Sequence, residues 1–535
     1  MKAKNLLLGL FAAFLLIYPA TTNAIPAFAR QYQTSCVTCH SDFPKLNDFG
    51  KAFKDAGFKF PTDDETFLKA PPLMLGSPAQ KDLFPHTVWP GTIPGQVPIG
   101  LRMNIYFQKT GENRGKFDAL LPAGTVPQFI PKTDFSTGLF SIFTAGNFGS
   151  DIAFWVDADL NVGGDNAAGG LGDGYLKFVN LGRIAKMPKD SFSLRIGRFE
   201  LDLPISQARN INISGYDIWD QANLGAQNPA FGQQNVTNQF TLADAMNGFE
   251  ISGGHQYGGY HYSLAIVDQN TSGIDQPNNS SSFVPSPAGF ASDSNFKDLY
   301  GRVAYRWNLE QDPKSRTAIQ GAGPSGPRDH TFISLGSFYF YGRSVQRFTG
   351  ADSLGNATVL TVREPFYRAG ADFNFNYHLL NIYGLWMYGY DHNRLPVDST
   401  GTLVPLPIDP AGPVPVGFVK GVPATFSGGF VQADYLALPW LMTIMRWDAV
   451  NSSEDRLNGL ALNTGTPFAL PFHTTRNRFT PGVQFLIHAN IKASFEYQYR
   501  PQQFVTVVTN PITGLPVAIQ PFRTNTLTGA LEWVF

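Results

Sequence analysis

The amino-acid sequence predicts an all-β transmembrane barrel of about sixteen antiparallel strands, preceded by a small α-helical N-terminal domain that plugs the barrel. Segments of alternating apolar and polar residues recur from about residue 98 to the end of the chain. Aromatic residues make up 14% of the chain and charged residues only 15%, against about 25% charged residues in soluble domains. The chain also stops at an aromatic residue, Phe535. Together these features indicate strands that present one face to lipid.

Residues 1–24 are predicted to be a secretory signal peptide. Lys2 and Lys4 precede the apolar run "LLLGLFAAFLLIYPA", and the small-residue stretch "TTNA" follows it. The run is too short and too close to a cleavage site to be a membrane-spanning helix. We therefore expect an exported chain that begins near Ile25.

The two cysteines of the chain both lie in "TSCVTCHSDFP", where Cys36 and Cys39 are followed directly by His40. A disulfide or redox dithiol, a zinc half-site and covalent haem attachment compete for them. A disulfide here would close a very small loop and stabilise little, and zinc would need a second Cys or His pair. Cys-x-x-Cys-His is the attachment signature of haem c. The motif therefore predicts one haem c, bound through both thiols, with His40 as the proximal iron ligand.

The residues after the motif are predicted to form a helix of a small cytochrome. In "DFPKLNDFGKAFKDAGF", Leu46, Phe49 and Phe53 form one apolar stripe, and Gly57 is a suitable helix end. The stripe would pack either against the porphyrin or against protein, and the sequence leaves both possibilities open. We expect residues 25–97 to form a monohaem cytochrome c domain.

The distal iron ligand has two candidates, Met74 in "APPLMLGSP" and His86 in "LFPHTVWPG". Met74 is preferred, because the prolines before it favour an extended backbone that presents the thioether with little conformational freedom left to lose. Met103 is excluded, because it lies on the apolar face of the next predicted strand.

Residues 98–535 are predicted to form an outer-membrane barrel. Strands such as "IGLRMNIYFQ", "LYGRVAYRW" and "IKASFEYQYR" carry charged residues on one face only. A soluble sandwich would show the same alternation. The lengths of the connections between strands therefore have to distinguish a barrel from a sandwich. Tight reversals at "NYHLLN" and "LALPWL" separate long loops at 200–245, 268–296 and 392–423. Short turns on one side and long loops on the other are typical of bacterial outer-membrane proteins.

The strand count predicts that both ends of the barrel lie on the periplasmic side and that the lumen is wide enough for water. The expected strands are 99–108, 138–146, 151–159, 173–180, 190–199, 246–255, 258–267, 297–307, 331–342, 367–377, 380–391, 425–437, 440–449, 478–488, 490–500 and 523–535.

Charge and motifs exclude several classes of function. The net charge of -1 offers no basic surface for nucleic acid. The sequence contains no G-x-S-x-G, no H-E-x-x-H and no phosphate-binding glycine loop. The expected partners are the lipid of the bacterial outer membrane, because of the predicted barrel, and redox molecules, because of the predicted haem.

The stretches "IPAFARQYQTSCVTCH" and "PKLNDFGKAFKDAGF", followed by a large barrel with a terminal Phe, resemble the fused outer-membrane monohaem cytochrome-porins. This family includes the iron oxidases of iron-oxidising bacteria, and the similarity in architecture covers the whole mature chain. Cys36, Cys39 and His40 match the family motif residue by residue, whereas Met74 and any iron site have no match. The resemblance implies an oxidoreductase that takes electrons from extracellular Fe(II) and passes them to a periplasmic c-type cytochrome.

Two other functions stay open at this point. Because the hydrocarbon layer is about 30 Å thick and insulating, an electron needs a redox centre inside the barrel to cross it. A diffusion porin that merely carries a haem would instead conduct ions. A haem enzyme such as a peroxidase would have an open sixth position on the iron. The motif does not determine the direction of electron flow.

Overall fold

The computed structural model describes most of the chain, and the predicted signal peptide, residues 1–24, and Phe535 lie outside its described residues. The described residues are 27–61, 64–77, 79–86, 91–110, 126–127, 133–160, 170–207, 209–220, 240, 242–268, 297–309, 331–351, 356–404, 414–421, 423–453, 475–501, 506–509, 516–519 and 525–534.

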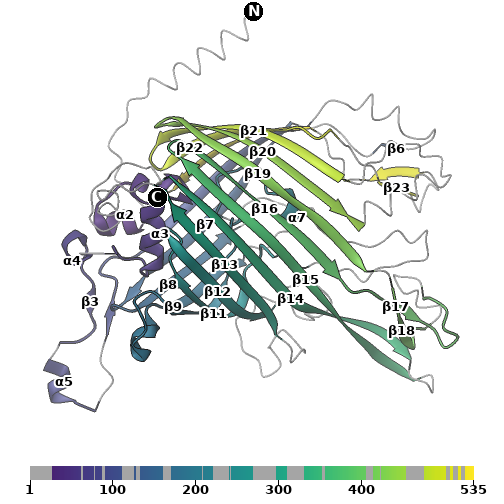
Figure 1. Cartoon of the computed structure of the whole chain (residues 1–535), viewed down its shortest axis with the longest axis horizontal. Coiled ribbons are helices and arrows are strands. Elements are labelled where there is room, and N and C mark those ends of the chain that lie inside the picture. Colours follow the sequence, from purple (N-terminus) through teal and green to yellow (C-terminus); the bar gives the residue numbers. More distant parts are fainter. Residues whose placement is uncertain are drawn as a thin grey trace, which may run out of the picture.

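Within these residues, sixteen strands pair antiparallel and close into one barrel (Figure 1). The barrel strands are β5 (Ile99–Thr110), β7 (Thr133–Phe148), β8 (Ile152–Leu160), β9 (Gly170–Phe178), β10 (Ser193–Phe199), β11 (Met246–Gly254), β12 (Gly259–Asp268), β13 (Asp298–Asn308), β14 (Phe332–Ala351), β15 (Ala357–Tyr377), β16 (Leu380–Asp391), β19 (Ala424–Leu438), β20 (Leu441–Ser452), β21 (Thr475–His488), β22 (Ile491–Gln498) and β25 (Thr526–Val534). The C-terminal strand β25 pairs with β5 and closes the ring.

The number of strands and their order confirm the prediction from alternation, and the largest differences in length are at β14 and β15. These strands were expected at 331–342 and 367–377, but their ladder continues outward to the pair Ala351↔Ala357. A tilted strand needs only about ten residues to cross a bilayer. The outer part of this hairpin therefore extends beyond the membrane, where no apolar face is required to signal it.

The barrel is apolar outside and charged inside. On β13, Leu299, Val303 and Tyr305 point outward and are 47%, 58% and 44% exposed, whereas Arg302 and Arg306 are buried inside. This is the reverse of a soluble protein and is the arrangement of outer-membrane barrels. The chain is therefore an outer-membrane β-barrel protein. No helix in the described part of the chain is long and apolar enough to cross a membrane.

Glycines opposite aromatic rings allow neighbouring strands to pack closely. Phe426 on β19 pairs with Gly389 on β16, and a Cβ atom on that glycine would overlap the aromatic ring. Phe338 covers Gly370 in the same way between β14 and β15. Such aromatic cover over glycine fixes the register of strands that otherwise present only a small residue.

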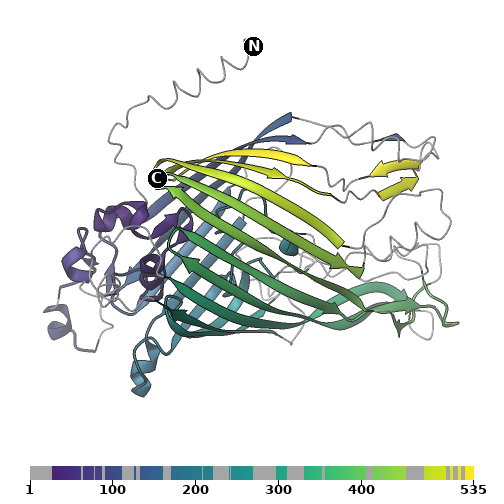
Figure 2. The same cartoon turned by 45° about the horizontal axis from the view of Figure 1, so that its top comes forward.

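Short connections identify one end of the barrel as the periplasmic end. Residues 149–151, 378–379, 439–440 and 489–490 each join two barrel strands by a tight turn. The end of β25 and the N-terminal helices lie at this same end (Figures 1 and 2). The small strands β17 and β18, and β23 with β6, lie at the opposite end (Figure 1). Their bounds are β17 (Arg394–Val397), β18 (Gly417–Lys420), β6 (Val126–Pro127), β23 (Thr506–Thr509) and β24 (Pro516–Ile519).

The N-terminal residues form a small domain of short elements at the periplasmic mouth. Its elements are α2 (Ala27–Tyr32), the 3₁₀ turn η1 (Cys36–Thr38), β1 (His40–Asp42), β2 (Lys45–Leu46), α3 (Asp48–Asp55), α4 (Asp64–Phe67), β3 (Leu73–Met74), α5 (Ala79–Leu83) and β4 (Thr92–Ile93). Phe53 of α3 is buried in an aromatic cluster with Tyr32, Phe58 and Phe60. Phe49 and Phe53 of the predicted apolar stripe thus pack against protein, but Leu46 lies on β2 and not on the helix, which starts at Asp48 after the N-cap Asn47. Helix α3 ends before Gly57, as expected.

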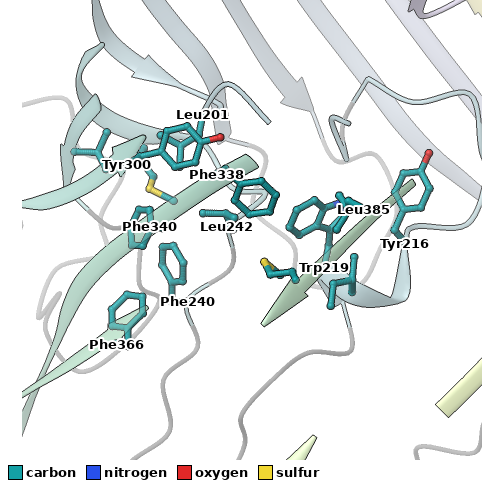
Figure 3. Packing of buried hydrophobic residues seen from close by; sticks show 14 of the residues in the cluster. Leu201, Tyr216, Trp219, Phe240, Leu242, Tyr300, Phe338, Phe340, Phe366 and Leu385 are labelled. Atoms are coloured by element: carbon teal, nitrogen blue, oxygen red, sulfur yellow. The ribbon is translucent and has the colours of Figure 1, made fainter. Parts of the chain in front are cut away.

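The connection between β10 and β11 folds back into the lumen, which the sequence analysis did not anticipate. Its helix α7 (Asp217–Asp220) packs on β19 and β20. A buried apolar cluster joins this connection to the inner faces of the strands, and Figure 3 shows Phe240 and Leu242 beside Phe340 and Phe366. The described residues of the segment expected as a long loop at 200–245 therefore place packed protein inside the barrel.

Candidate functional site

Cys36 and Cys39 lie on one tight turn at the start of the site. The residues Cys36–Thr38 form the 3₁₀ turn η1, and the N–H of Cys39 donates to the carbonyl oxygen of Cys36 at 3.1 Å. Side chains three residues apart on such a turn lie on the same side. Both thiols are therefore presented in one direction, and His40 follows them at the start of β1.

Two residues that the sequence analysis missed hold this turn against helix α3. The side-chain Nδ2 of Asn47 donates to the carbonyl oxygens of Val37 and Thr38 at 3.3 and 3.1 Å. Gly50 approaches the carbonyl of Cys39 so closely that a Cβ atom would overlap it. Asn47 is the N-cap of α3, accepting from the N–H of Gly50 at 2.9 Å. Only the preference of Asn for the N-cap position could have identified it from the sequence.

The imidazole of His40 has the tautomer that a metal ligand needs. Its Nδ1 lies 3.1 Å from the carbonyl oxygen of Pro44. Because a carbonyl only accepts, Nδ1 carries the proton and Nε2 carries the lone pair. Burial lowers the pKa of His40 to about 4, so the ring is neutral near pH 7. Metal-binding histidines donate their second N–H to a backbone carbonyl in this way, which orients the ring.

The two thiols lack the properties of a reactive dithiol. Burial raises the pKa of Cys36, and burial together with the neighbouring Cys36 raises the pKa of Cys39 to about 12. Redox-active cysteines need the opposite, a lowered pKa that favours the thiolate. Two protonated thiols on one side of a turn, followed by a neutral and oriented imidazole, fit the residues that hold a haem c.

Lysine side chains connect the segment after His40 to the inner wall of the barrel. Lys45 donates to Asn381 on β16 at 2.7 Å and to Asp434 on β19 at 2.8 Å. From β22, the ammonium group of Lys492 donates to the carbonyl oxygen of Phe43. The motif is therefore positioned by the barrel wall at the periplasmic mouth.

A buried ion pair anchors the domain to the far side of the mouth. Arg306 on β13 donates to both carboxylate oxygens of Asp48 at 2.6 Å, and both side chains are buried. The guanidinium also stacks over the ring of Phe332 at 3.5 Å. In the closed order of the described barrel, β13 and β22 are seven strands apart. The domain therefore contacts the barrel wall on two strands that are far apart around the ring.

Asp42 is a buried carboxyl group close to the motif, and the sequence analysis did not single it out. It is 2% exposed, and neither carboxylate oxygen has a hydrogen-bond partner among the described residues. Burial raises its pKa to about 6, and the charge of Lys492 opposes that shift. No described contact explains why this carboxyl group is buried.

The two candidates for the distal ligand both lie outside the packed part of the domain. Met74 is on β3, which pairs with β4, and its side chain is 47% exposed. In Figure 1, β3 and α5 belong to an arm that projects away from the barrel. His86 follows α5 and is exposed. The structure thus places Met74 on a different small sheet from His40, and an iron bond to Met74 stays a prediction.

Met103 lies on barrel strand β5, with Ile99 and Ile105 exposed to lipid on the same alternating face. This position agrees with its exclusion as an iron ligand. In the part of the chain that is described, no group of three or more His, Cys, Asp or Glu residues is arranged to hold a metal ion.

The inner connection is fixed below the domain by a network of charges. Asp217 pairs with Arg478 on β21 and with Arg500, each at 3.0 Å. Glu496 on β22 accepts from the N–H groups of Ile213 and Ser214 at 2.7 and 3.0 Å. These contacts cross the lumen from the end of β10 to β21 and β22. A polar cavity of about 110 Å³, lined by Lys51 among others, lies between the domain and this connection.

Comparisons with known proteins find similarity only among solved structures. No protein-family model matches the chain, and no curated protein matches it. The anion-selective porin from Comamonas acidovorans is 10% identical with a TM-score of 0.44, over 82% of this chain and 99% of the porin. OmpT of Vibrio cholerae, in the trimer form, is 8% identical with a TM-score of 0.42, over 82% of this chain and 99% of OmpT. OprB of Pseudomonas putida is 10% identical with a TM-score of 0.43, over 82% of this chain and 94% of OprB.

Proposed function

We propose that this chain transfers electrons at the bacterial outer membrane through one covalently bound haem c. Cys36 and Cys39 would each form a thioether by adding their S–H across a vinyl group of the porphyrin, and Nε2 of His40 would bind the iron. The observation that carries the proposal is the hydrogen bond from Nδ1 of His40 to Pro44, next to two thiols on one side of a turn. When bound, the haem supplies a centre that holds one electron.

The residues around the motif would position the haem and would form no bond to it. Asn47 and Gly50 fix the turn that carries the thiols, and Pro44 fixes the orientation of His40. Lys45 and Lys492 fix the following segment to the barrel wall. Met74 would be the distal ligand, a role that requires the β3–β4 arm to fold over the iron.

The proposed donor is extracellular Fe(II) and the proposed acceptor is a periplasmic c-type cytochrome. Each Fe(II) ion would be oxidised to Fe(III) and would release one electron, which the acceptor receives. The resemblance of residues 25–58 to the cytochrome-porins, a family that includes iron oxidases, supports Fe(II) as the donor. The position of the domain at the periplasmic end supports an acceptor on that side. The chain would accordingly be an oxidoreductase.

Denaturing electrophoresis of the purified protein, stained for haem, tests the attachment. Thioethers survive denaturation, whereas a coordination bond alone does not, so the band should keep its haem. Cys36→Ala combined with Cys39→Ala should lose it while the barrel still assembles. Stopped-flow mixing of the oxidised protein with Fe(II) then tests the reaction. Haem retained by the double variant would refute the attachment, and no reduction by Fe(II) would refute the donor.

A diffusion channel that carries a haem is the second candidate function. The closed sixteen-strand barrel with a charged inner face, as the described residues form it, favours this candidate. Conductance of the full-length protein in a planar bilayer discriminates between the two. Stable, ion-selective conductance steps would support the channel, whereas electron transfer requires no conductance.

A further inference from the structure

We propose that residues 181–190, here called the rim segment, anchor the barrel in the periplasmic leaflet of the outer membrane. Ile184 and Met187 would enter the lipid interface, and Lys186 and Lys189 would bind the phosphates of anionic phospholipids. The inference is independent of the haem and of the direction of electron flow.

The rim segment exposes two large apolar side chains. Ile184 is 84% exposed and Met187 is 44% exposed. The connection that contains them covers residues 179–192, whereas residues 149–151 or 439–440 suffice to join other strands at the same end. The additional length is therefore not needed to close the barrel.

The backbone of the rim segment is well fixed, so these side chains are held in place. The N–H of Met187 donates to the carbonyl of Gly182 at 2.9 Å, and the N–H of Asp190 donates to the side chain of Asn180 at 2.7 Å. The 3₁₀ turn η2 (Leu181–Ala185) lies between two left-handed residues, Asn180 and Lys186. An ordered turn and its hydrogen bonds thus hold these apolar side chains at the surface.

The rim segment continues the surface that already faces lipid. On β9 and β10, Leu176 pairs with Ile196 and Phe178 pairs with Leu194, all on the outer face. A Cβ atom on Gly182 would lie 3.3 Å from the Cβ of Phe192, which stands next to this apolar face. In Figures 1 and 2 the short blue-green coil after β9 projects sideways from the periplasmic rim of the barrel. It therefore lies where the inner edge of the bilayer meets the barrel.

The charges of the rim segment fit anionic headgroups. Lys186 and Lys189 are exposed, and no ion pair in the described part of the chain involves them. Arg183 has a partner, Asp151 at 2.9 Å, but both side chains are open to solvent. Apolar side chains between lysines are typical of segments that lie in the membrane interface. Each lysine near an anionic surface strengthens binding about fivefold.

Depth measurements with a nitroxide spin label test the anchor in the full-length protein. The label is placed at Ile184→Cys, in vesicles of phosphatidylcholine with and without phosphatidylglycerol. A matched control carries the label at Thr400→Cys, an exposed position in a turn beyond β17. The chain without an added cysteine gives the background from Cys36 and Cys39. Relaxation by oxygen reports lipid, and relaxation by a soluble nickel chelate reports water.

The proposal expects the label at position 184 to be more accessible to oxygen than to nickel, with the opposite result at position 400. Phosphatidylglycerol should move the label deeper, and Lys186→Gln with Lys189→Gln should abolish that shift. Equal nickel access at both positions would overturn the proposal, because the segment would then lie in water. Protection from both reagents would also overturn it, because a protein surface would then cover the segment.

Discussion

Removing Asp48 should loosen the N-terminal domain from the barrel mouth, because it leaves the charge of Arg306 buried without its partner. The two groups share two hydrogen bonds of 2.6 Å, and their side chains are 5% and 3% exposed. Lys51, which lies 3.3 Å from Asp48, also loses its partner. The perturbation is Asp48→Ala, compared with Arg306→Ala and with both changes together.

The expected magnitude follows from the burial of the pair. Breaking a buried ion pair by removing one partner costs about 3–5 kcal/mol. Since a factor of ten corresponds to about 1.4 kcal/mol, the open state of the domain should become roughly a hundred to a few thousand times more populated. The double variant leaves no unpaired charge at this pair, so it should cost less than the sum of the two single changes.

Native-state hydrogen exchange of the α3 amides in detergent measures this opening. The exposed pair Arg183–Asp151, with side chains 75% and 39% exposed, is a matched control. Exposed pairs contribute only about 0.2–1 kcal/mol, and Asp151→Ala should leave α3 protection nearly unchanged. If the two single changes add within about 0.5 kcal/mol in the double variant, the pair is not coupled and the reasoning fails.

Three further outcomes are expected. Met74→Ala should abolish the thioether-to-iron band of the ferric spectrum and lower the reduction potential of the haem, while the haem stays attached. His86→Ala is the control and should change neither the band nor the potential. A ferric spectrum that changes in the His86 variant and not in the Met74 variant would assign the ligand to His86. Gly389→Ala should displace Phe426 and reduce the yield of folded barrel, measured by heat-dependent migration on gels. Gly417→Ala, on β18, is the control, because a Cβ atom there meets only Val397 at 3.9 Å and should leave the folded yield nearly unchanged. Asp64→Asn should weaken the hydrogen bond from Tyr32 at 2.6 Å and cost about 1–3 kcal/mol of domain stability, measured by urea unfolding of the domain signal; no change would contradict this role.

The barrel was predictable because each strand carries its own signal. On β13, for example, Leu299 and Val303 alternate with Arg302 and Arg306, and a strand between lipid and lumen needs no more information than this. The long β14–β15 hairpin exceeded its prediction because its outer part is not constrained by lipid. The alternation of apolar and polar residues thus predicts the part of a strand that crosses the membrane. It does not predict how far the strand continues outside.

The interior was not predictable, because contacts between distant residues determine it. Asp217 is 261 positions before Arg478 along the chain (478 − 217), and nothing near either residue indicates that they pair at 3.0 Å. The candidate site likewise combines residues that the local sequence predicts with contacts that it does not. Cys36, Cys39 and His40 form a contiguous motif, whereas the contact of Lys492 with Phe43 depends on the completed barrel.

One part of the described interior is packed with apolar side chains, like a protein core. Tyr216 stacks on Phe430 with ring centroids 3.9 Å apart, and both are almost completely buried, as are Met246 and Val450. A solute path needs continuous polar walls, and burying apolar groups at this depth works against it. These packed residues therefore obstruct diffusion across this part of the lumen, so any solute path has to follow the charged side chains of the inner wall, such as Arg302, Asp372 and Arg368.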